Sequence, residues 1–154
     1  MQRRKGSRAR KALLPVFFMI EYKEKKKRFF YLGVELADCF ITYPYSEGFS
    51  EFNEFYESIS QNAFEWFCTQ LCEMSTAEYE TDTDEKKRFT KNVYKYTADF
   101  SVKEEKENLL KVELKASLKK GKGESISEFC DVQIWDTQEG IMVRSKKKKR
   151  DRAK

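Results

Sequence analysis

Residues 49–74, which read FSEFNEFYESISQNAFEWFCTQLCEM, carry the most regular apolar pattern in the chain. Their large apolar side chains recur at steps of three and four residues, which is the period of one buried stripe on an α-helix. The stripe comprises Phe52, Phe55, Tyr56, Ile59, Ala63, Trp66, Phe67, Leu71 and Met74. We expect a helix over residues 50–74 with Ser50 as its N-cap. The stripe should pack on a sheet, because so much aromatic surface is unfavourable in water.

Alternating apolar and polar residues before and after this helix predict strands. Residues 16–22 predict a first strand that ends in a solvated turn at residues 23–28, and residues 29–43 predict its hairpin partner. Pro44 should end the pairing, because proline has no amide hydrogen to donate. Beyond the helix, residues 75–88 lack an apolar stripe and predict an exposed connection.

The second half of the chain predicts its clearest hairpin, formed by residues 94–102 and 110–118, where every second side chain is apolar. Two further strands are expected at residues 126–135 and 141–143. In the first of these, alternate positions on one face are apolar: Cys130, Val132 and Ile134. The fold class expected is α+β, with an antiparallel β-sheet of about five strands packed on one long amphipathic helix.

The charge of the chain is unevenly distributed. The formal net charge of the 154 residues is +5. Residues 1–11 carry six Lys or Arg and no acid, and residues 144–154 carry eight against one Asp, whereas residues 12–143 have a net charge of −8. We therefore expect a disordered basic tail at 1–11, a single α+β domain at 12–143 and a disordered basic tail at 144–154, because neither tail has periodic apolar residues.

The C-terminal basic run is the strongest charge feature, and it leaves two interpretations open. It could bind nucleic acid weakly through phosphate contacts, or it could serve only to keep the protein in solution. The residues that would make the phosphate contacts are Lys146, Lys147, Lys148, Lys149, Arg150 and Arg152.

No catalytic or metal-binding motif emerges from the sequence. The chain has no His, so the commonest general base is missing, and an enzyme would need Asp, Glu, Lys or Tyr for acid and base chemistry. Its four cysteines include no CxxC pair, and they are expected to be small buried residues. We expect no enzymatic activity, no cofactor, no catalytic residue and no metal site.

A binding surface is expected on the sheet face that the helix leaves free. In the hairpin of residues 94–118, the positions between the apolar ones are polar and of mixed charge, which suits a transient protein contact. The candidate partner-binding residues are Lys95, Asp99, Lys111, Glu113 and Lys115. The alternative is that these residues only keep the sheet in solution.

The order of several segments resembles a bacterial family. These segments are FITYP at 40–44, the helix with Asn53 and Ile59, the hairpin at 96–118, the glycine turn at 121–123 and VQIWDTQEG at 132–140. Over residues 38–143 the chain looks like the extracytoplasmic domain of RsiV-type anti-sigma factors and the accessory domain of PdaC-type peptidoglycan deacetylases. The resemblance implies an α+β domain that binds a protein or a cell-wall ligand and is not itself catalytic.

The chain departs from that family at the glycine turn, where Gly121-Lys122-Gly123 replaces a Gly-Gly-Ala-His turn. No functional residue of the family is carried over. The resemblance implies a place outside the cytoplasm. The sequence as given instead reads as soluble and cytoplasmic, because its apolar run at 12–20 is interrupted by Pro15, has no cleavage site and is too short to cross a bilayer.

Overall fold

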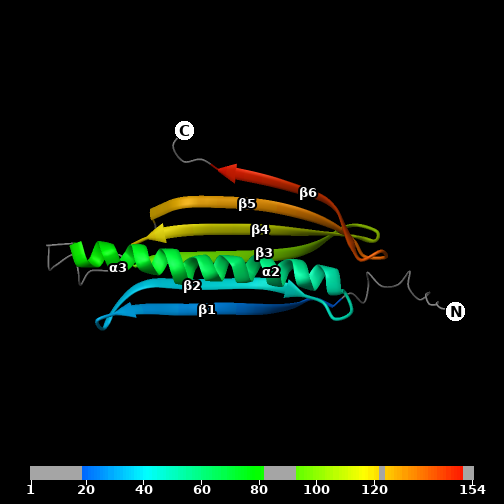
Figure 1. Cartoon of the computed structure of the whole chain (residues 1–154). Coiled ribbons are helices and arrows are strands. Elements are labelled where there is room, and N and C mark those ends of the chain that lie inside the picture. Colours follow the sequence, from blue (N-terminus) through cyan, green and yellow to red (C-terminus); the bar gives the residue numbers. More distant parts are fainter. Residues whose placement is uncertain (1–18, 82–92, 122–123, 151–154) are drawn as a thin grey trace.

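The computed structural model describes residues 19–81, 93–121 and 124–150, which form one helix lying along one face of a six-stranded sheet (Figure 1). The expected α+β class is confirmed, but the sheet has six strands and not about five. The elements are β1 (Glu21–Tyr31), β2 (Val34–Tyr45), α2 (Ser50–Trp66), the π-helical turn η2 (Phe67–Leu71), α3 (Cys72–Thr81), β3 (Tyr94–Lys106), β4 (Leu109–Lys120), β5 (Glu124–Asp136) and β6 (Ile141–Arg150).

The strands lie in the sheet in the same order as in the chain, from β1 to β6. Every neighbouring pair is antiparallel except β2 and β3, which are parallel. A parallel pair needs a long crossover, and here the helix supplies it. The β2–β3 pairing stops at Thr42 and Asp99, whereas β1 continues to pair with β2 through Pro44. Pro44 therefore ends the pairing on one side of its strand only.

The helix is one continuous unit of 32 residues made of α2, η2 and α3, and it is longer than expected. Ser50 is its first residue and not its N-cap; Phe49 takes that position and gives no side-chain cap. The start is fixed by Asn53 instead. The Ser46 N–H donates to Asn53 Oδ1 at 2.8 Å, and Asn53 Nδ2 donates to the Ser46 carbonyl at 2.8 Å.

The π-helical turn shifts the buried stripe by one residue. It begins at Phe67, which is fully buried, as is Leu71. A π-helical turn contains one residue more than an α-helical one, so the positions beyond it rotate away from the predicted stripe. Ser75 is therefore buried, whereas Met74 is 41% exposed. Trp66, just before the turn, is 38% exposed and rests against Tyr96.

The core lies between the helix and one face of the sheet. Aromatic contacts identify that face, because the Tyr56 ring packs on Phe100 at 5.2 Å and the Phe52 ring packs on Trp135 at 5.2 Å. The main buried residues of the cluster are Ala37, Cys39, Ile41, Tyr43, Phe52, Tyr56, Phe67, Leu71, Tyr94, Ala98, Phe100, Leu110, Val112, Leu114 and Trp135.

The apolar pattern of β5 predicts which of its faces packs on the helix, and in the structure the other face does so. Val132 pairs with Glu113 of β4, and Ile134 pairs with Lys111, which places both apolar residues away from the helix. The helix face of β5 instead carries Gln133 and Trp135, both buried. These two side chains are held by Tyr56, whose hydroxyl donates to Gln133 Oε1 at 2.8 Å and accepts from Trp135 Nε1 at 2.8 Å.

The two edge strands also differ from expectation. Residues 23–28 were expected to form a turn, but they lie inside β1, and the turn comes later at residues 32–33. The last strand was expected to end at residue 143, but β6 continues to residue 150. The expected tail at 1–11 and residues 151–154 lie outside the described part of the chain. Among the described residues, no helix is both long and apolar enough to cross a membrane.

Candidate functional site

The sheet face opposite the helix, called the open face below, carries the candidate partner-binding residues. Tyr96 and Phe100 of β3 contact the helix, so the residues between them point to the other side. On β3 and β4 the open face consists of Lys95, Thr97, Asp99, Ser101, Lys103, Lys111, Glu113, Lys115, Ser117 and Lys119. All five residues predicted from the sequence are in this set, and no helix of the described residues covers them.

Two of the predicted residues are tied to each other. Glu113 lies 3.4 Å from Lys111 Nζ and 3.8 Å from Lys103 Nζ, so one carboxylate neutralises part of the charge of two lysines. Lys103 and Lys111 lie directly opposite one another on β3 and β4, where like charges repel. Glu113 therefore relieves this repulsion, and its first role is within the sheet.

A shallow hollow of about 420 Å³ lies on the open face across β3, β4 and β5. It is lined by Thr97, Asp99, Lys115, Ala116, Ser117, Lys119, Glu128, Phe129 and Cys130. Only Asp99 and Lys115 of these were predicted as site residues. The other polar members follow from the same strand alternation on β4 and β5, but the sequence could not show that the two strands align Lys115 with Cys130 and Ser117 with Glu128.

Several polar groups of the hollow already form hydrogen bonds within the protein. Thr42 Oγ1 donates to Asp99 Oδ1 at 2.7 Å, and Ser125 Oγ donates to Glu128 Oε2 at 3.1 Å. Thr97 Oγ1 and Ser117 Oγ share a hydrogen bond of 3.1 Å. Lysine ammonium groups at the rim are therefore the strongest groups available to an incoming ligand.

The helix itself is acidic, in contrast to the lysine-rich open face. Between Ser50 and Thr81 the helix carries seven glutamates and no Lys or Arg. The residues are Glu51, Glu54, Glu57, Glu65, Glu73, Glu78 and Glu80. The helix is therefore acidic, although Lys25 and Lys120 of the sheet pair with Glu57 and Glu78, whereas on the opposite face of β3 and β4 the lysines outnumber the acids.

The basic run of the C-terminus borders the open face. In β6, Lys146 pairs with Val132, Lys148 pairs with Cys130, and Arg150 pairs with Glu128. Lys147 and Lys149 alternate with these in the same strand, while Arg152 lies outside the described residues. The structure thus places the backbone of the run beside the hollow.

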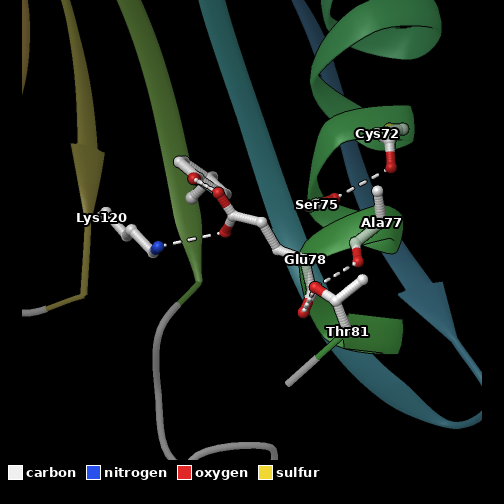
Figure 2. A network of polar contacts seen from close by, with 7 residues as sticks. Cys72, Ser75, Ala77, Glu78, Thr81 and Lys120 are labelled. Atoms are coloured by element: carbon white, nitrogen blue, oxygen red, sulfur yellow. Dashed lines mark hydrogen bonds and ion pairs between the residues drawn. The ribbon is translucent and has the colours of Figure 1, made fainter. Parts of the chain in front are cut away.

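Among the described residues, two carboxylates of the helix each contact both a tyrosine and a lysine of the sheet. Figure 2 shows one of these two sites, where Glu78 of α3 reaches toward β4. Lys120 Nζ donates to Glu78 at 3.0 Å, and the Tyr94 hydroxyl donates at 2.8 Å. The hydrogen bond to Glu78 raises the pKa of Lys120, whereas burial is the main reason that the pKa of Tyr94 is raised.

The same arrangement recurs at Glu57 of α2. The Tyr43 hydroxyl donates to one carboxylate oxygen at 2.7 Å, and Lys25 Nζ lies 3.1 Å from the other. The hydrogen bond from Tyr43, followed by that from Lys25, lowers the pKa of Glu57. These groups hold the helix on the sheet, so we assign them to the fold and not to the binding site.

We expect the Glu57 contact to make stability depend on pH in acid. A carboxyl group with a lowered pKa stabilises the fold above its ordinary value of 4.5, and this contribution is lost as the pH falls through its folded-state pKa. Glu57→Gln should therefore cost about 0.5 to 1 kcal/mol at pH 7, a small value because the carboxylate is half exposed. Thermal melts at pH 7 and pH 3 would show the difference from wild type shrinking in acid. Glu54→Gln is the control, and an equal effect there would contradict the assignment.

Three of the cysteines lie close together near the core, and two of them line a second hollow. Cys68 and Cys72 line a wide hollow beside β1 and the helix, and Cys39 of β2 lies near both. Burial raises the pKa of Cys39 to about 12 and that of Cys72 to about 11, so both are thiols at neutral pH. All four cysteines are free, and within the described residues no group of three or more Cys, Asp or Glu is arranged to hold a metal.

The fold and the open face together define an α+β protein with one helix on a six-stranded sheet. No family model matches the chain, and no curated protein matches it. Among solved structures, it is similar to the crystal structure of a member of the DUF3298 family from Bacteroides fragilis, with a TM-score of 0.50 and 9% sequence identity. The similarity covers 82% of this chain and 60% of that one, so the chain spans less than two thirds of that protein. At this identity the likeness concerns the fold alone.

Proposed function

We propose that this protein is a non-enzymatic binding domain that holds a protein partner, or a cell-wall ligand, on its open face. The observation that supports the proposal is the one-sided cover of the sheet. The described helix lies on one face and leaves the other, with its exposed lysines and its hollow, open to contact. A polar face of mixed charge suits a reversible contact whose specificity comes from the placement of charges.

The sequence resemblance to RsiV-type and PdaC-type accessory domains supports the same proposal, since it implies a ligand-binding domain outside the cytoplasm. Membership of that family is part of the proposal. The absence of His favours a binding role over acid and base catalysis, and the most buried phenol, Tyr56, already uses its hydroxyl in the core.

We expect a partner that binds the open face to be lost when two of its lysines are reversed in charge. The variant is Lys111→Glu/Lys115→Glu, and the measurement is recovery of the partner from native cell extract by the immobilised protein. The matched control is Lys23→Glu/Lys27→Glu, which makes the same change of charge on β1. Both control residues pair with residues of the helix face of β2.

The result expected is that wild type and control recover the partner and that the open-face variant does not, with all three giving the same circular dichroism spectrum. Recovery by the open-face variant equal to that of wild type would contradict the proposal. The partner-binding site would then be expected in the loops at residues 121 and 137.

Nucleic-acid binding is the second candidate, and the position of β6 favours it. The run Lys146–Arg150 lies in the edge strand β6, whose backbone pairs with β5 next to the open face. Deleting residues 144–154 is not a clean test, because it removes most of β6. Treating the extract with nuclease before the pull-down separates the two candidates, since a nucleic-acid-mediated contact should disappear.

A further inference from the structure

Three lysines of the open face have no acidic partner among the described residues. Lys95, Lys115 and Lys119 are all exposed, and none of them lies within 4 Å of a carboxylate oxygen of a side chain that the structure describes. Asp99, which lies opposite Lys115 in the β3–β4 register, accepts from Thr42 instead. These ammonium groups are therefore free to meet a ligand.

Lys95 and Lys119 also lie directly opposite one another on β3 and β4. Like charges in this position destabilise a sheet. At the other end of the hairpin the equivalent pair, Lys103 and Lys111, is bridged by Glu113. Within the described part of the chain no acidic residue bridges Lys95 and Lys119, so an anion supplied from outside would relieve the repulsion between them.

We propose that the hollow receives a carboxylate from an acidic segment of the protein partner, an inference that rests on the proposed function. Lys115 and Lys119 line the hollow and would each donate to the carboxylate, and the hydroxyls of Thr97 and Ser117 lie on its wall. Charge-assisted hydrogen bonds of this kind are stronger than those between neutral groups. Apart from Glu57 and Glu78, which pair with Lys25 and Lys120, the glutamates of the helix repel the same segment from the other side of the molecule, so it approaches the open face.

The acids of the open face favour an isolated carboxylate over a nucleic-acid strand. Asp99 and Glu128 line the hollow itself, and Glu113 lies two residues from Lys115 on the same strand. A continuous phosphate backbone laid across β3, β4 and β5 would place phosphates close to these carboxylates, and the like charges would repel. A single acidic side chain needs only the two lysines.

The test measures binding of the full chain to a fluorescein-labelled peptide of sixteen residues rich in glutamate, by fluorescence anisotropy. We expect Lys115→Gln/Lys119→Gln to weaken binding about tenfold. The matched control is Lys26→Gln/Lys103→Gln, which removes the same charge from the open face. In the wild-type protein Lys26 and Lys103 already lie near Glu24 and Glu113, so this control variant should weaken peptide binding by less than about twofold. Glu128→Gln should strengthen binding, because it removes a carboxylate that faces the ligand.

Four results would overturn the inference. An equal loss of peptide binding in the two double lysine variants would show only general attraction between charged chains. Unchanged or weaker peptide binding by Glu128→Gln would show that the hollow is not the site. Binding of a labelled oligouridylate that depends on Lys115 and Lys119, without binding of the peptide, would assign the hollow to nucleic acid. A cellular partner lost with Lys111→Glu/Lys115→Glu but kept by Lys115→Gln/Lys119→Gln would leave the proposed function standing and overturn this inference alone.

Discussion

Phe67→Ala is expected to lower the free energy of unfolding by about 3 to 5 kcal/mol, and the melting temperature by roughly 10 °C. Phe67 is fully buried and begins the π-helical turn, where it packs in the cluster between the helix and the sheet. Truncating a buried ring removes apolar contact and leaves a cavity that the surrounding side chains fill only in part. Urea denaturation followed by circular dichroism would measure the loss.

The neighbouring aromatic residue provides the control. Trp66 is larger than Phe67, but it is 38% exposed, and its ring contacts that of Tyr96 on the sheet at 5.6 Å. Trp66→Ala should therefore cost less than half as much as Phe67→Ala. The opposite order would mean that the helix turns its other side to the core and that the π-helical turn is misplaced.

Tyr56→Phe is expected to cost about 2 to 4 kcal/mol, although it removes a single oxygen atom. The hydroxyl is buried, and burial raises the pKa of Tyr56. It joins the helix to β5, because it donates to Gln133 and accepts from Trp135. The phenylalanine variant leaves a buried amide oxygen and a buried indole N–H without a partner, and each carries a desolvation penalty.

Tyr43→Phe is the matched control for this prediction. It removes the same atom from another buried tyrosine, but that hydroxyl donates to Glu57, whose carboxylate is half exposed and can bond to water instead. We expect a cost under about 1 kcal/mol. Equal losses in the two variants, measured by urea denaturation, would contradict the buried network. Losses near zero in both variants would mean that the tyrosines contribute through their rings alone.

The sequence was sufficient for features that depend on near neighbours. The helix was predicted from the three-to-four spacing of its apolar residues, and the β3–β4 hairpin from its strict alternation. Alternation also placed Lys95, Asp99, Lys111, Glu113 and Lys115 on one face. Each of these patterns repeats within a few residues, so the chain alone specifies them.

The hollow and the free lysines needed the three-dimensional structure. Whether Lys119 faces Lys95, or Cys130 faces Lys115, depends on the register between strands, which the alternation on each strand leaves undetermined. One signal was present but not used: the alternation of β4 continues through Ser117 and Lys119, beyond the residues predicted for the site.

By itself, then, the sequence determined the α+β class, the helix and the polar hairpin, because local periodicity identifies the side of each element that can be buried. Only the tertiary structure decided the parallel pairing of β2 with β3, the orientation of β5 and the extension of β6. The reason is clearest at β5, where both faces carry apolar residues. Tyr56 of the helix selects Gln133 and Trp135 by hydrogen bonding, and this leaves Val132 and Ile134 on the other side. The choice rests on a partner nearly eighty residues away in the chain.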